Sequence, residues 1–461
     1  MKSFFFLLLA CVVVIPSYAA DPPSTHTDSV AVLIRNETFR AWHAYARYAF
    51  GHDGFRPLSK KAYDWYDAPL GITLIDAYST LSLMGFKQEA DHIEKYVAAN
   101  ADFNRDMFVK TFEVDIRVLG GLLDMYEISG DPKILNKAED FGKRLLPAFS
   151  SRTGIPHYWV NLKTGATRGD TVNVAEGGSS LIEMGVLSAF TGKPVYYQAA
   201  KRATKALYSR RSPIGLVAQD INVETGAWID HQSHIGACID SYYEYLLKGW
   251  LLFHDPELKT MWESSIAAIN RYIADDGPGG LWYGKVDMRT GARISSTVTL
   301  YDAFFPALLT LSGDVLRAAR LQDSWDRLWN KNGLEPMVYD YRRDSVLDAS
   351  YDLNPEIMES AYYLFSRTAD PKYRQRAEKY FDDIERYCRT DEAFASIKDI
   401  RTKEQADDLP SFFFAETMKY LYLTFTNVTH FGYAQVIFST EAHPFQTSLF
   451  NDRSLKKKLG Y

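Results

Sequence analysis

Five acidic residues stand inside apolar, aromatic-rich segments that are spread over most of the chain. They are Glu113 in TFEVDIRVLGGLL, Asp240 in ACIDSYYEYLL, Glu356 in NPEIMESAYYLF, Glu416 in SFFFAETMKYLYL and Glu441 in VIFSTEAHP. An ionised carboxylate is rarely buried without a partner. Acids that converge from distant segments therefore predict a shared site for a polar ligand, a metal ion or acid–base chemistry. The alternative is that each acid is paired separately or faces solvent.

Three of these acids have a second charged residue on the same helical face. The pairs are Glu113–Arg117, Asp240–Glu244 and Glu356–Glu359, at spacings of three or four residues. The first pair is explained by an intrahelical ion pair. Each of the other two places acids beside one another, and their repulsion requires a cation, a water network or a polyol ligand nearby.

Turn signals recur at regular intervals and divide the chain into helical hairpins. With Asp131, Lys193, Asp255, Asp314 and Asp370 as the marks, successive gaps are 62, 62, 59 and 56 residues. Each mark follows an apolar helical pattern and precedes an amphipathic one. Gly tends to end the first helix and Pro to start the second, as helix termini prefer. Repeats of this size indicate stacked helical hairpins.

The hairpins are expected to close into a ring. The first helix of each pair is apolar nearly all round and should be buried, whereas the second has one wet face. With an opening pair around residues 76–96 and a closing helix around 416–425, about seven hairpins fit. The last helix is as apolar as the middle ones, so it lacks the polar cap of an open solenoid. We therefore predict an all-α toroid, with strands confined to connections such as 155–162 and 280–286.

The acids are expected at one end of the inner helices. Asn354 is predicted to be an N-cap, Pro355 the first helical residue and Glu356 part of the first turn. Asp240 leads DSYYEYLL in the same way, and Glu113 leads a helix at 112–123. In an α/α ring this end opens into the central cavity. Helix N-termini also favour acids through capping alone.

Composition and the N-terminal segment indicate an exported globular protein. The 461 residues are 46% hydrophobic with a net charge of -6, and a mildly acidic chain without a basic face does not predict nucleic-acid binding. Residues 1–20 have the basic start, apolar run and small-x-small end of a signal peptide, which leaves 21–461 as one catalytic domain. No other stretch approaches the roughly 20 apolar residues of a membrane span. We expect a monomer that is secreted or periplasmic, or in the ER and secretory lumen if the source is eukaryotic.

Cysteine and histidine do not indicate a metal site. Outside the signal segment only Cys238 and Cys388 remain, and one disulfide between them is possible. Their spacing matches no metal motif. His231, His234 and His443 show no zinc spacing, and we expect them to have buried or surface polar roles.

Several segments together resemble a known family. TFEVDIRVLGGLLDMYEISGD, GIPHYWVNL, DSYYEYLLK, NPEIMES, SFFFAETMKYLYLTF and FSTEAHP are similar to the signature blocks of glycoside hydrolase family 47, in the family's order, from about Trp42 to Pro444. These are the class I α-mannosidases and their ER-degradation-enhancing relatives. The resemblance implies an (α/α)7 barrel that holds Ca2+ at its floor. It also implies removal of α-1,2-linked mannose from the ends of oligomannose glycans, with inversion.

The resemblance assigns roles to individual residues. Glu113 and Arg117 match the family's F-E-x-x-I-R block, Asp240 its D-S-Y-Y-E-Y-L block, and Glu356, as general base, its x-P-E block. Thr440 matches the threonine that binds Ca2+ through its hydroxyl and main-chain carbonyl. The matched residues that line the site, hydrogen-bond the calcium waters or pack under the sugar are Glu176, Glu359, Glu416, Glu441 and Phe412. We also expect Glu244, on the face of Asp240, to contact the substrate.

The sequence departs from the family pattern near the site. Asn354 replaces the Arg of R-P-E, Cys238 replaces the Arg that stands two residues before the active-site Asp, and His52–Phe55 replaces D-E-L. The block SLQAFFPGL of the degradation-enhancing branch is TLYDAFFPALL here. These changes leave the proposed acid, base and metal residues in place, and they bear on linkage preference and on contacts to outer sugars.

The expected chemistry is inverting hydrolysis of a glycoside. One carboxylic acid protonates the leaving oxygen and a carboxylate activates water on the opposite face of the sugar, with the two groups about 6.5–9.5 Å apart. Glu356 is the expected base, and the sequence leaves Glu113 and Asp240 both open as the acid. The alternatives are a mannose-glycan receptor on the same ring with weak or no turnover, a helical-repeat scaffold that binds other proteins, and a different toroidal glycosidase or lyase.

Overall fold

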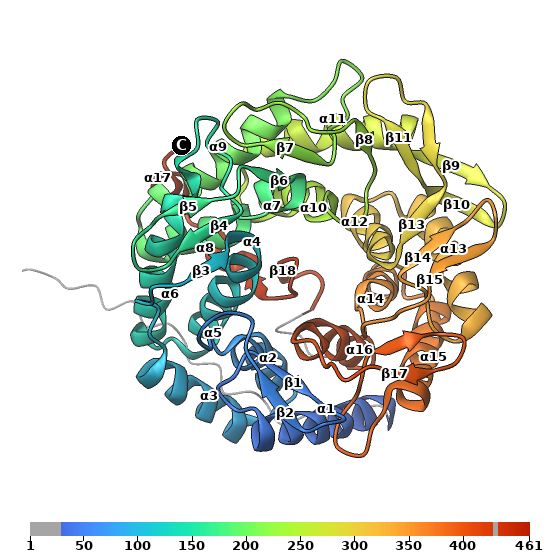
Figure 1. Ribbon diagram of the computed structural model, residues 1–461, viewed down its shortest axis with the longest axis horizontal. Helices are drawn as coiled ribbons and strands as arrows, with labels where there is room; N and C mark the ends of the chain where they lie inside the picture. The colour runs from blue at the N-terminus through green and yellow to red at the C-terminus, as the bar shows by residue number, and fades with distance from the viewer. Residues whose placement is uncertain (1–28, 427–431) are drawn as a thin grey trace, which may run out of the picture.

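Helices of the computed structural model form two concentric rings (Figure 1). The structure describes residues 29–426 and 432–461, so the predicted signal peptide, residues 1–20, lies outside the described residues. The inner ring consists of α2 (Ile72–Leu83), α5 (Gly120–Ser129), α8 (Leu181–Thr191), α10 (Asp240–Phe253), α12 (Phe305–Ser312), α14 (Glu356–Thr368) and α16 (Met418–Thr424). The outer ring consists of α1 (Ser29–Tyr48), α3 (Lys87–Asn100), α6 (Pro132–Leu145), α9 (Val195–Ser209), α11 (Pro256–Tyr272), α13 (Val315–Asn332) and α15 (Pro371–Cys388). This arrangement confirms the predicted (α/α)7 barrel.

The turn signals mark the start of outer helices, as their chemistry predicts. Asp131, Asp255 and Asp370 are N-caps whose side chains accept a hydrogen bond from a backbone N–H two residues later, and Pro follows each of them. Gly130 ends inner helix α5 in the left-handed conformation, with φ of 70°. His254 adopts that conformation after α10, with φ of 58°. The residues at these turns therefore set where one helix of a pair ends and the next begins.

The ring closes between the two ends of the described chain. Six helix pairs are consecutive hairpins among the described residues, but α16 packs against α1 instead of a following helix. Inner helix α2 packs against η4 (Phe413–Thr417), a π-helical turn that leads into α16. Helix α1 was not predicted from the sequence. Its role follows from its buried face, which includes Ile34, Trp42 and Tyr45.

Short helical segments extend the inner helices on one side of the ring. They are α4 (Thr111–Val114) and η1 (Asp115–Leu119) before α5, α7 (Val174–Gly178) before α8, and η3 (Leu300–Phe304) before α12. The helix expected at 112–123 is thus divided by the π-helical turn η1. Such wide turns are frequent at functional sites.

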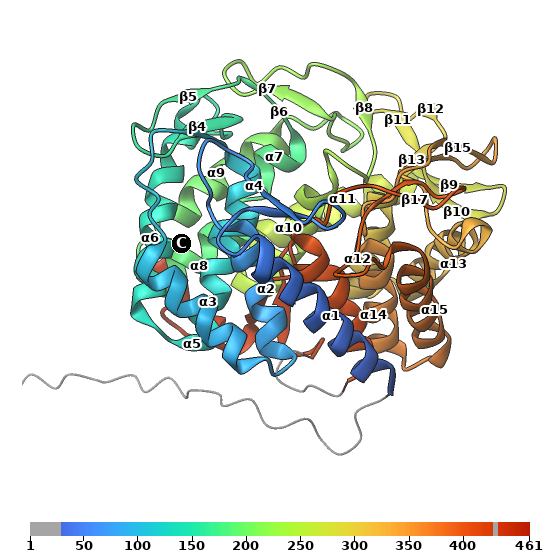
Figure 2. The ribbon, with the colours of Figure 1, turned by 60° about the horizontal axis from the view of Figure 1, so that its bottom comes forward.

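Antiparallel strands cover the same side of the ring (Figure 2). The sheets are β1–β2 (Gly54–Arg56, Lys61–Tyr63), β3–β4–β5 (Phe108–Lys110, Trp159–Asn161, Thr167–Arg168), β6–β7 (Thr171–Asn173, Asp220–Asn222), β8–β11–β12 (Gln232–Ser233, Lys285–Asp287, Arg293–Ser295), β9–β10 (Ala274–Gly277, Gly280–Tyr283), β13–β14–β15 (Thr297–Thr299, Val338–Asp340, Ser345–Asp348) and β16–β17 (Ile397–Asp399, Glu404–Gln405). They lie in the long connections from an outer helix to the next inner helix. The expected strands in these connections are confirmed, and they surround the ends of the inner helices that carry the acids.

A further hairpin enters the centre of the ring (Figure 1). Strands β18 (Val436–Phe438) and β19 (Pro444–Gln446) pair with Ile437 opposite Phe445, and β18 contacts α10 while β19 contacts α5. Buried side chains on both strands, including Ile437, Phe438 and Phe445, fill the middle of the barrel. This hairpin was not predicted, and it closes the ring as a floor. The segments η2 (Leu146–Ser150), η6 (Thr447–Phe450) and α17 (Leu455–Leu459) complete the described chain.

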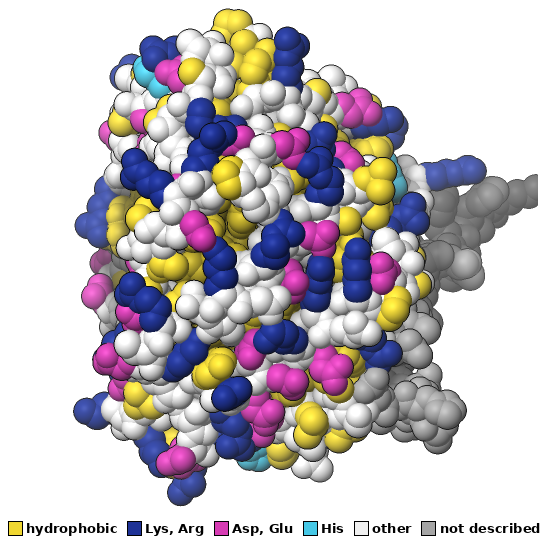
Figure 3. All heavy atoms as spheres, turned by 90° about the vertical axis from the view of Figure 1, so that its right-hand side faces the viewer, with side chains coloured by type: hydrophobic (Ala, Val, Ile, Leu, Met, Phe, Trp, Pro, Cys, Tyr) yellow, Lys and Arg dark blue, Asp and Glu magenta, His cyan; other side chains and the backbone are white. Residues whose placement is uncertain are grey.

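The outer surface differs in character from the inner ring. On the face shown in Figure 3, Lys and Arg side chains are interspersed with Asp and Glu and with scattered apolar side chains. This mixture is typical of outer helices that bury one face only. Within residues 29–426 and 432–461, no helix is both long enough and apolar enough to cross a membrane.

Candidate active site

A central cavity of about 280 Å³ lies above the β18–β19 floor, at the N-terminal ends of the inner helices. Its wall is strongly acidic: among the described residues it contains eight carboxylate side chains and a single guanidinium, that of Arg117. The acids are Glu113, Glu176, Asp240, Glu244, Glu356, Glu359, Glu416 and Glu441. Thr440 and Phe412 also line the cavity. Every residue that the sequence analysis assigned to the site therefore faces one space.

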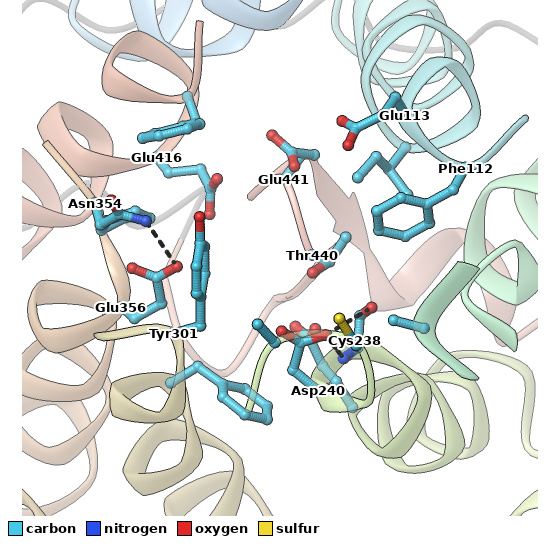
Figure 4. A pocket seen from close by; sticks show the side chains of 18 of the residues that line it. Phe112, Glu113, Cys238, Asp240, Tyr301, Asn354, Glu356, Glu416, Thr440 and Glu441 are labelled. Atoms are coloured by element: carbon cyan, nitrogen blue, oxygen red, sulfur yellow. Dashed lines mark hydrogen bonds between the residues drawn. The ribbon is translucent and has the colours of Figure 1, made fainter. Parts of the chain in front are cut away.

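The three proposed catalytic acids occupy different walls. Figure 4 shows Glu356 and Glu113 on opposite sides of the cavity, Asp240 on a third side, and Thr440 with Glu441 between them. The side chains of Glu113, Asp240 and Glu356 are half-buried, whereas Glu416 and Glu441 are buried. Glu176 is half-buried as well, so four of the eight acids keep exposed surface in the cavity.

Arg117 pairs with acids from distant segments. Its Nε lies 3.1 Å from Oε2 of Glu113, and its Nη1 also donates to Glu441 from the floor hairpin. A third acid, Asp76 of α2, lies 3.7 Å from the same Nη1. The guanidinium also lies over the ring of Phe412, 5.8 Å from its centroid. Arg117 therefore forms an intrahelical pair, as expected, and in addition joins three elements of the site.

Burial in the cavity favours protonated carboxyls. Burial, with a contribution from the carboxyl of Glu244, raises the pKa of Asp240 to about 7. It raises the pKa of Glu356 to about 8, with additional repulsion from Glu359 and Asp240. Burial likewise raises the pKa of Glu176 to about 7. Several of these groups consequently retain protons near neutral pH unless a cation lies beside them.

The start of α14 differs from the prediction. Pro355 is the N-cap and the helix begins at Glu356, so Asn354 does not cap it. The side-chain amide of Asn354 instead donates to Oε1 of Glu356 at 3.3 Å. Leu353 adopts a left-handed φ of 63°, and its carbonyl accepts a hydrogen bond of 2.6 Å from Thr417 Oγ1. This geometry directs the Asn354 amide to the Glu356 carboxylate and away from the backbone of the helix.

A buried lysine offsets the repulsion between the paired acids. Lys248, one turn after Glu244 in α10, donates to Glu244 and lies 3.7 Å from Oε1 of Glu359 in α14. The side chains of Lys248 and Glu244 are both buried. Tyr420 of α16 donates to Glu359 at 3.3 Å. The cation that this acid cluster requires is therefore part of the protein, and the Glu244-x-x-x-Lys248 spacing was the signal in the sequence.

The remaining residues of the cavity wall were not assigned a role from the sequence, although Cys238 and Asn354 were expected near the site. They are Phe112, Ile116, Asn173, Ala175, Ala237, Cys238, Ser241, Tyr301, Phe304, Asn354 and Pro355. The side chain of Asn173 accepts a hydrogen bond from the Glu176 backbone while the Glu176 side chain accepts one from the Asn173 backbone, a capping box that fixes Glu176. Its Asn-x-x-Glu pattern could have been recognised. Tyr301, between Glu356 and Asp240 in Figure 4, carried no signal of its own.

The possible disulfide is not formed. Cys238 and Cys388 are both free, and they lie in different parts of the fold. Cys238 lines the central cavity with a left-handed φ of 82°, whereas Cys388 is buried at the end of outer helix α15. The helix ring separates the two positions.

The oxygen atoms around Thr440 suit a hard cation. In the part of the chain that the structure describes, no three His, Cys, Asp or Glu side chains are placed to hold a metal ion directly. Thr440, in the turn of the floor hairpin, lines the cavity among carboxylate side chains, and it carries a hydroxyl and a carbonyl oxygen. Oxygen donors with water ligands are the coordination that Ca2+ accepts. The residues present therefore fit calcium held by Thr440, with water between the ion and the carboxylates.

Comparison with known proteins identifies the family. Residues 38–447 match the model of glycosyl hydrolase family 47. The chain is 34% identical over 474 residues to alpha-mannosidase I MNS5 of Arabidopsis thaliana, covering 95% of this chain and 82% of that protein. It is 34% identical over 464 residues to human ER degradation-enhancing alpha-mannosidase-like protein 2, covering 93% of this chain and 79% of that protein.

A solved structure agrees with the sequence comparisons. The alpha-1,2-mannosidase from Trichoderma reesei superposes with a TM-score of 0.84 at 26% sequence identity, and the match covers 93% of this chain and 100% of that chain. The helices of the barrel and the residues that line the acidic cavity thus lie largely within the part of the chain that matches these proteins. The chain belongs to glycosyl hydrolase family 47.

Proposed function

We propose that the protein is a Ca2+-dependent, inverting exo-α-mannosidase that hydrolyses α-1,2-linked mannose from the ends of oligomannose glycans, with mannobiose as a minimal substrate. The observation that carries the proposal is the single cavity that brings Glu113, Asp240 and Glu356 together above Thr440. Membership of the family and the similarity to an alpha-1,2-mannosidase support the linkage.

The shape of the site favours removal of terminal sugars. Among the described residues, the floor hairpin lies beneath the cavity, so we infer that a glycan enters from the side that carries the strands. The cavity volume of about 280 Å³ is just below the range of about 300–1,000 Å³ that ligand pockets occupy. A closed, small cavity accommodates the end of a glycan and excludes its interior.

The acids divide between two roles. An inverting enzyme needs a protonated carboxyl on one side of the scissile bond and a carboxylate that activates water on the other. We assign the base to Glu356, which receives a hydrogen bond from Asn354, and the acid to Asp240 or Glu113 on the other walls. Burial raises the pKa of Asp240 to about 7, which suits a group that must retain a proton near neutrality. Because burial raises the pKa of Glu356 to about 8, its action as a base requires that its proton be lost first.

Thr440 would hold the calcium ion. When bound there, the ion would supply positive charge that stabilises the ionised forms of the nearby carboxyls and attracts sugar hydroxyls. Glu441 would stay in place through Arg117, and Glu416, which lines the same cavity, would accept hydrogen bonds from water. Phe412, over the Arg117 guanidinium, offers an apolar surface to the carbon face of the sugar.

We further propose export of a mature, monomeric domain spanning residues 21–461, on the basis of the signal-peptide pattern at residues 1–20. A glycan substrate outside the cytoplasm is compatible with a secreted or periplasmic protein, or with the ER and secretory lumen in a eukaryotic source.

A second candidate function is a mannose-glycan receptor with weak or no turnover. The 34% identity to human ER degradation-enhancing alpha-mannosidase-like protein 2 is the reason to test this receptor function. Cys238 and Asn354 also stand at cavity positions where the family pattern has arginine. Both replacements remove positive charge from the wall, which would alter contacts to the sugar.

The test is hydrolysis of α-1,2-mannobiose by the purified protein, with calcium and with a chelator. We expect calcium-dependent release of mannose with inverted configuration. The configuration is monitored through the NMR signal of the anomeric proton. Glu356→Gln should lower kcat by about 100- to 10,000-fold, the usual contribution of a general base. Near-normal turnover by this variant would remove Glu356 as the base. Binding of the disaccharide by the wild type without turnover would favour the receptor.

A further inference from the structure

The turn between β18 and β19, residues 439–443, has one side towards the cavity and one side towards the buried core. Thr440 and Glu441 line the cavity above it, whereas His443 is fully buried below. The turn is closed by a hydrogen bond of 2.9 Å from Ser439 N to His443 O and one of 3.1 Å from Ala442 N to Ser439 O. Ala442 adopts a left-handed φ of 54°, which costs energy for a residue with a Cβ atom. The surroundings must therefore stabilise this conformation.

The His443 side chain lies between two carboxylates from different inner helices. Its Nδ1 is 2.7 Å from Oδ2 of Asp124 in α5, and its Nε2 is 3.5 Å from Oδ1 of Asp76 in α2. All three side chains are 0% exposed. Burial lowers the pKa of His443, but the two aspartates outweigh burial and raise it to about 9. An imidazolium in this position is hydrogen-bonded to Asp124 and lies within ion-pair distance of Asp76.

Two glycines make room for the imidazole ring. A Cβ atom on Gly120 would lie 2.8 Å from Cδ2 of His443, and one on Gly121 would lie 3.1 Å from its Cε1. Both distances are shorter than ordinary contacts of a Cβ atom, so side chains at these positions would displace the ring. The Gly-Gly pair in α5 thus explains how His443 reaches Asp124 one turn further along the helix.

The rest of the turn is attached to other inner helices. Lys419 of α16, itself buried, donates to the Ala442 carbonyl at 2.5 Å. The backbone N–H of Thr440 donates to the Tyr245 hydroxyl of α10 at 3.3 Å. Glu441 accepts from Arg117, whose Nη1 is 3.7 Å from Oδ2 of Asp76. Asp76 therefore connects the support of His443 with that of Glu441.

We propose that His443, clamped between Asp124 and Asp76, is a positioning residue that fixes the Thr440 oxygen atoms for cation binding. The inference rests on the proposed function, because Thr440 is the proposed calcium ligand. Buried charges of this kind are expensive unless their geometry is well defined, and removing one partner is strongly destabilising. The support beneath a metal ligand also contributes to affinity, since residues that orient such ligands typically change metal affinity by about 10–100-fold when mutated.

Two variants and one control test the inference. His443→Gln removes the charge and retains a hydrogen-bonding side chain. Gly120→Ala keeps every charge but places a methyl group against the ring, and Ala is the better helix former by about 1 kcal/mol. Gly249→Ala in α10 is the matched control, because its Cβ would lie 2.9 Å from a Leu181 methyl group and makes no contact with the turn. Each protein is titrated with Ca2+ by calorimetry, and its unfolding is measured in chelator.

We expect the calcium dissociation constant to be about 10–100-fold larger for His443→Gln and Gly120→Ala than for the wild type, and unchanged for Gly249→Ala. If His443→Gln does not fold, Gly120→Ala decides the question. A structural role without positioning would lower the unfolding temperature but leave calcium affinity of the folded variants unchanged, and that result would overturn the inference. Absence of calcium binding by the wild-type protein would instead overturn the assignment of Thr440, and with it both proposals.

Discussion

Removal of the buried cation under the acid cluster is the most direct test of how this cavity tolerates so many carboxylates. In Lys248→Met, an apolar side chain of similar length replaces the ammonium group between Glu244 and Glu359. Lys248 is 2% exposed, so solvent does not screen the change. A separation of 3.7 Å from Glu359, at an effective dielectric constant of about 20, corresponds to about 4 kcal/mol of attraction. Loss of one partner from a buried pair costs about 3–5 kcal/mol, which is the same range.

The loss should depend on pH in a defined direction. Burial raises the pKa of Glu359 to about 7 while Lys248 lowers it, so the variant should have a still higher pKa at this position. Below the pKa that Glu359 has in the unfolded chain, its carboxyl is protonated in the folded state as well. Lys248 then has no charge on Glu359 to attract and contributes least to stability. The destabilisation should therefore be largest above about pH 8 and shrink towards about pH 5.

The assay is urea unfolding of the metal-free protein at both pH values. Lys259→Met is the matched control, because Lys259 forms an exposed pair with Glu263 at 3.8 Å that should contribute less than about 1 kcal/mol. Combining Lys248→Met with Glu244→Gln and Glu359→Gln should restore most of the stability, since no unpaired charge remains. A loss below about 1 kcal/mol in the single variant at high pH would refute the reasoning. Failure of the triple variant to recover would assign the effect to packing of the lysine stem.

Two further predictions concern the whole chain. In chelator, the unfolding temperature should fall as the pH rises from about 4 to about 8. Burial raises the folded-state pKa values of Asp240, Glu441 and Glu356 to about 7, 7 and 8, so over this range the unfolded chain has lost protons that the folded state still holds, and the fall ends once the groups ionise in the folded state too. A flat or rising profile in calorimetry would contradict this, and calcium should reduce the fall. A reductant should leave the unfolding temperature unchanged, because Cys238 and Cys388 are free. Loss of a disulfide would cost about 2–5 kcal/mol, so a clear decrease would show that they pair.

Much of the fold follows from local sequence signals. The Asp-Pro and Gly turn signals mark helix ends because a side-chain cap, a fixed proline φ and a left-handed glycine act within a few residues. Asp131 and Gly130 are examples. The position of Glu113, Asp240 and Glu356 at one end of the inner helices follows from the same signals together with the alternation of apolar and amphipathic helices. The expectation that these acids share one space required only that the hairpins close into a ring.

Other features depend on contacts between distant segments. Helix α1 packs against α16, and His443 lies between α2 and α5, so both contacts join residues hundreds of positions apart. The floor hairpin β18–β19 had no recognisable local pattern. Asn354 shows how tertiary contacts override a local signal. It is a favourable N-cap by type, yet the left-handed Leu353 and the Thr417 hydrogen bond direct its amide to Glu356.

The helical repeat, the ends of its helices and the acids that face the centre follow from the amino-acid sequence alone, because these features depend on periodicity and on capping within one turn. How so many carboxylates are tolerated in one cavity becomes clear only from the folded arrangement. Lys248 compensates Glu244 and Glu359, Arg117 reaches Glu441, and His443 is enclosed by two aspartates only once the ring has closed. Electrostatic attraction between charges depends on their separation in space, and this separation cannot be read from the number of residues between them in the sequence.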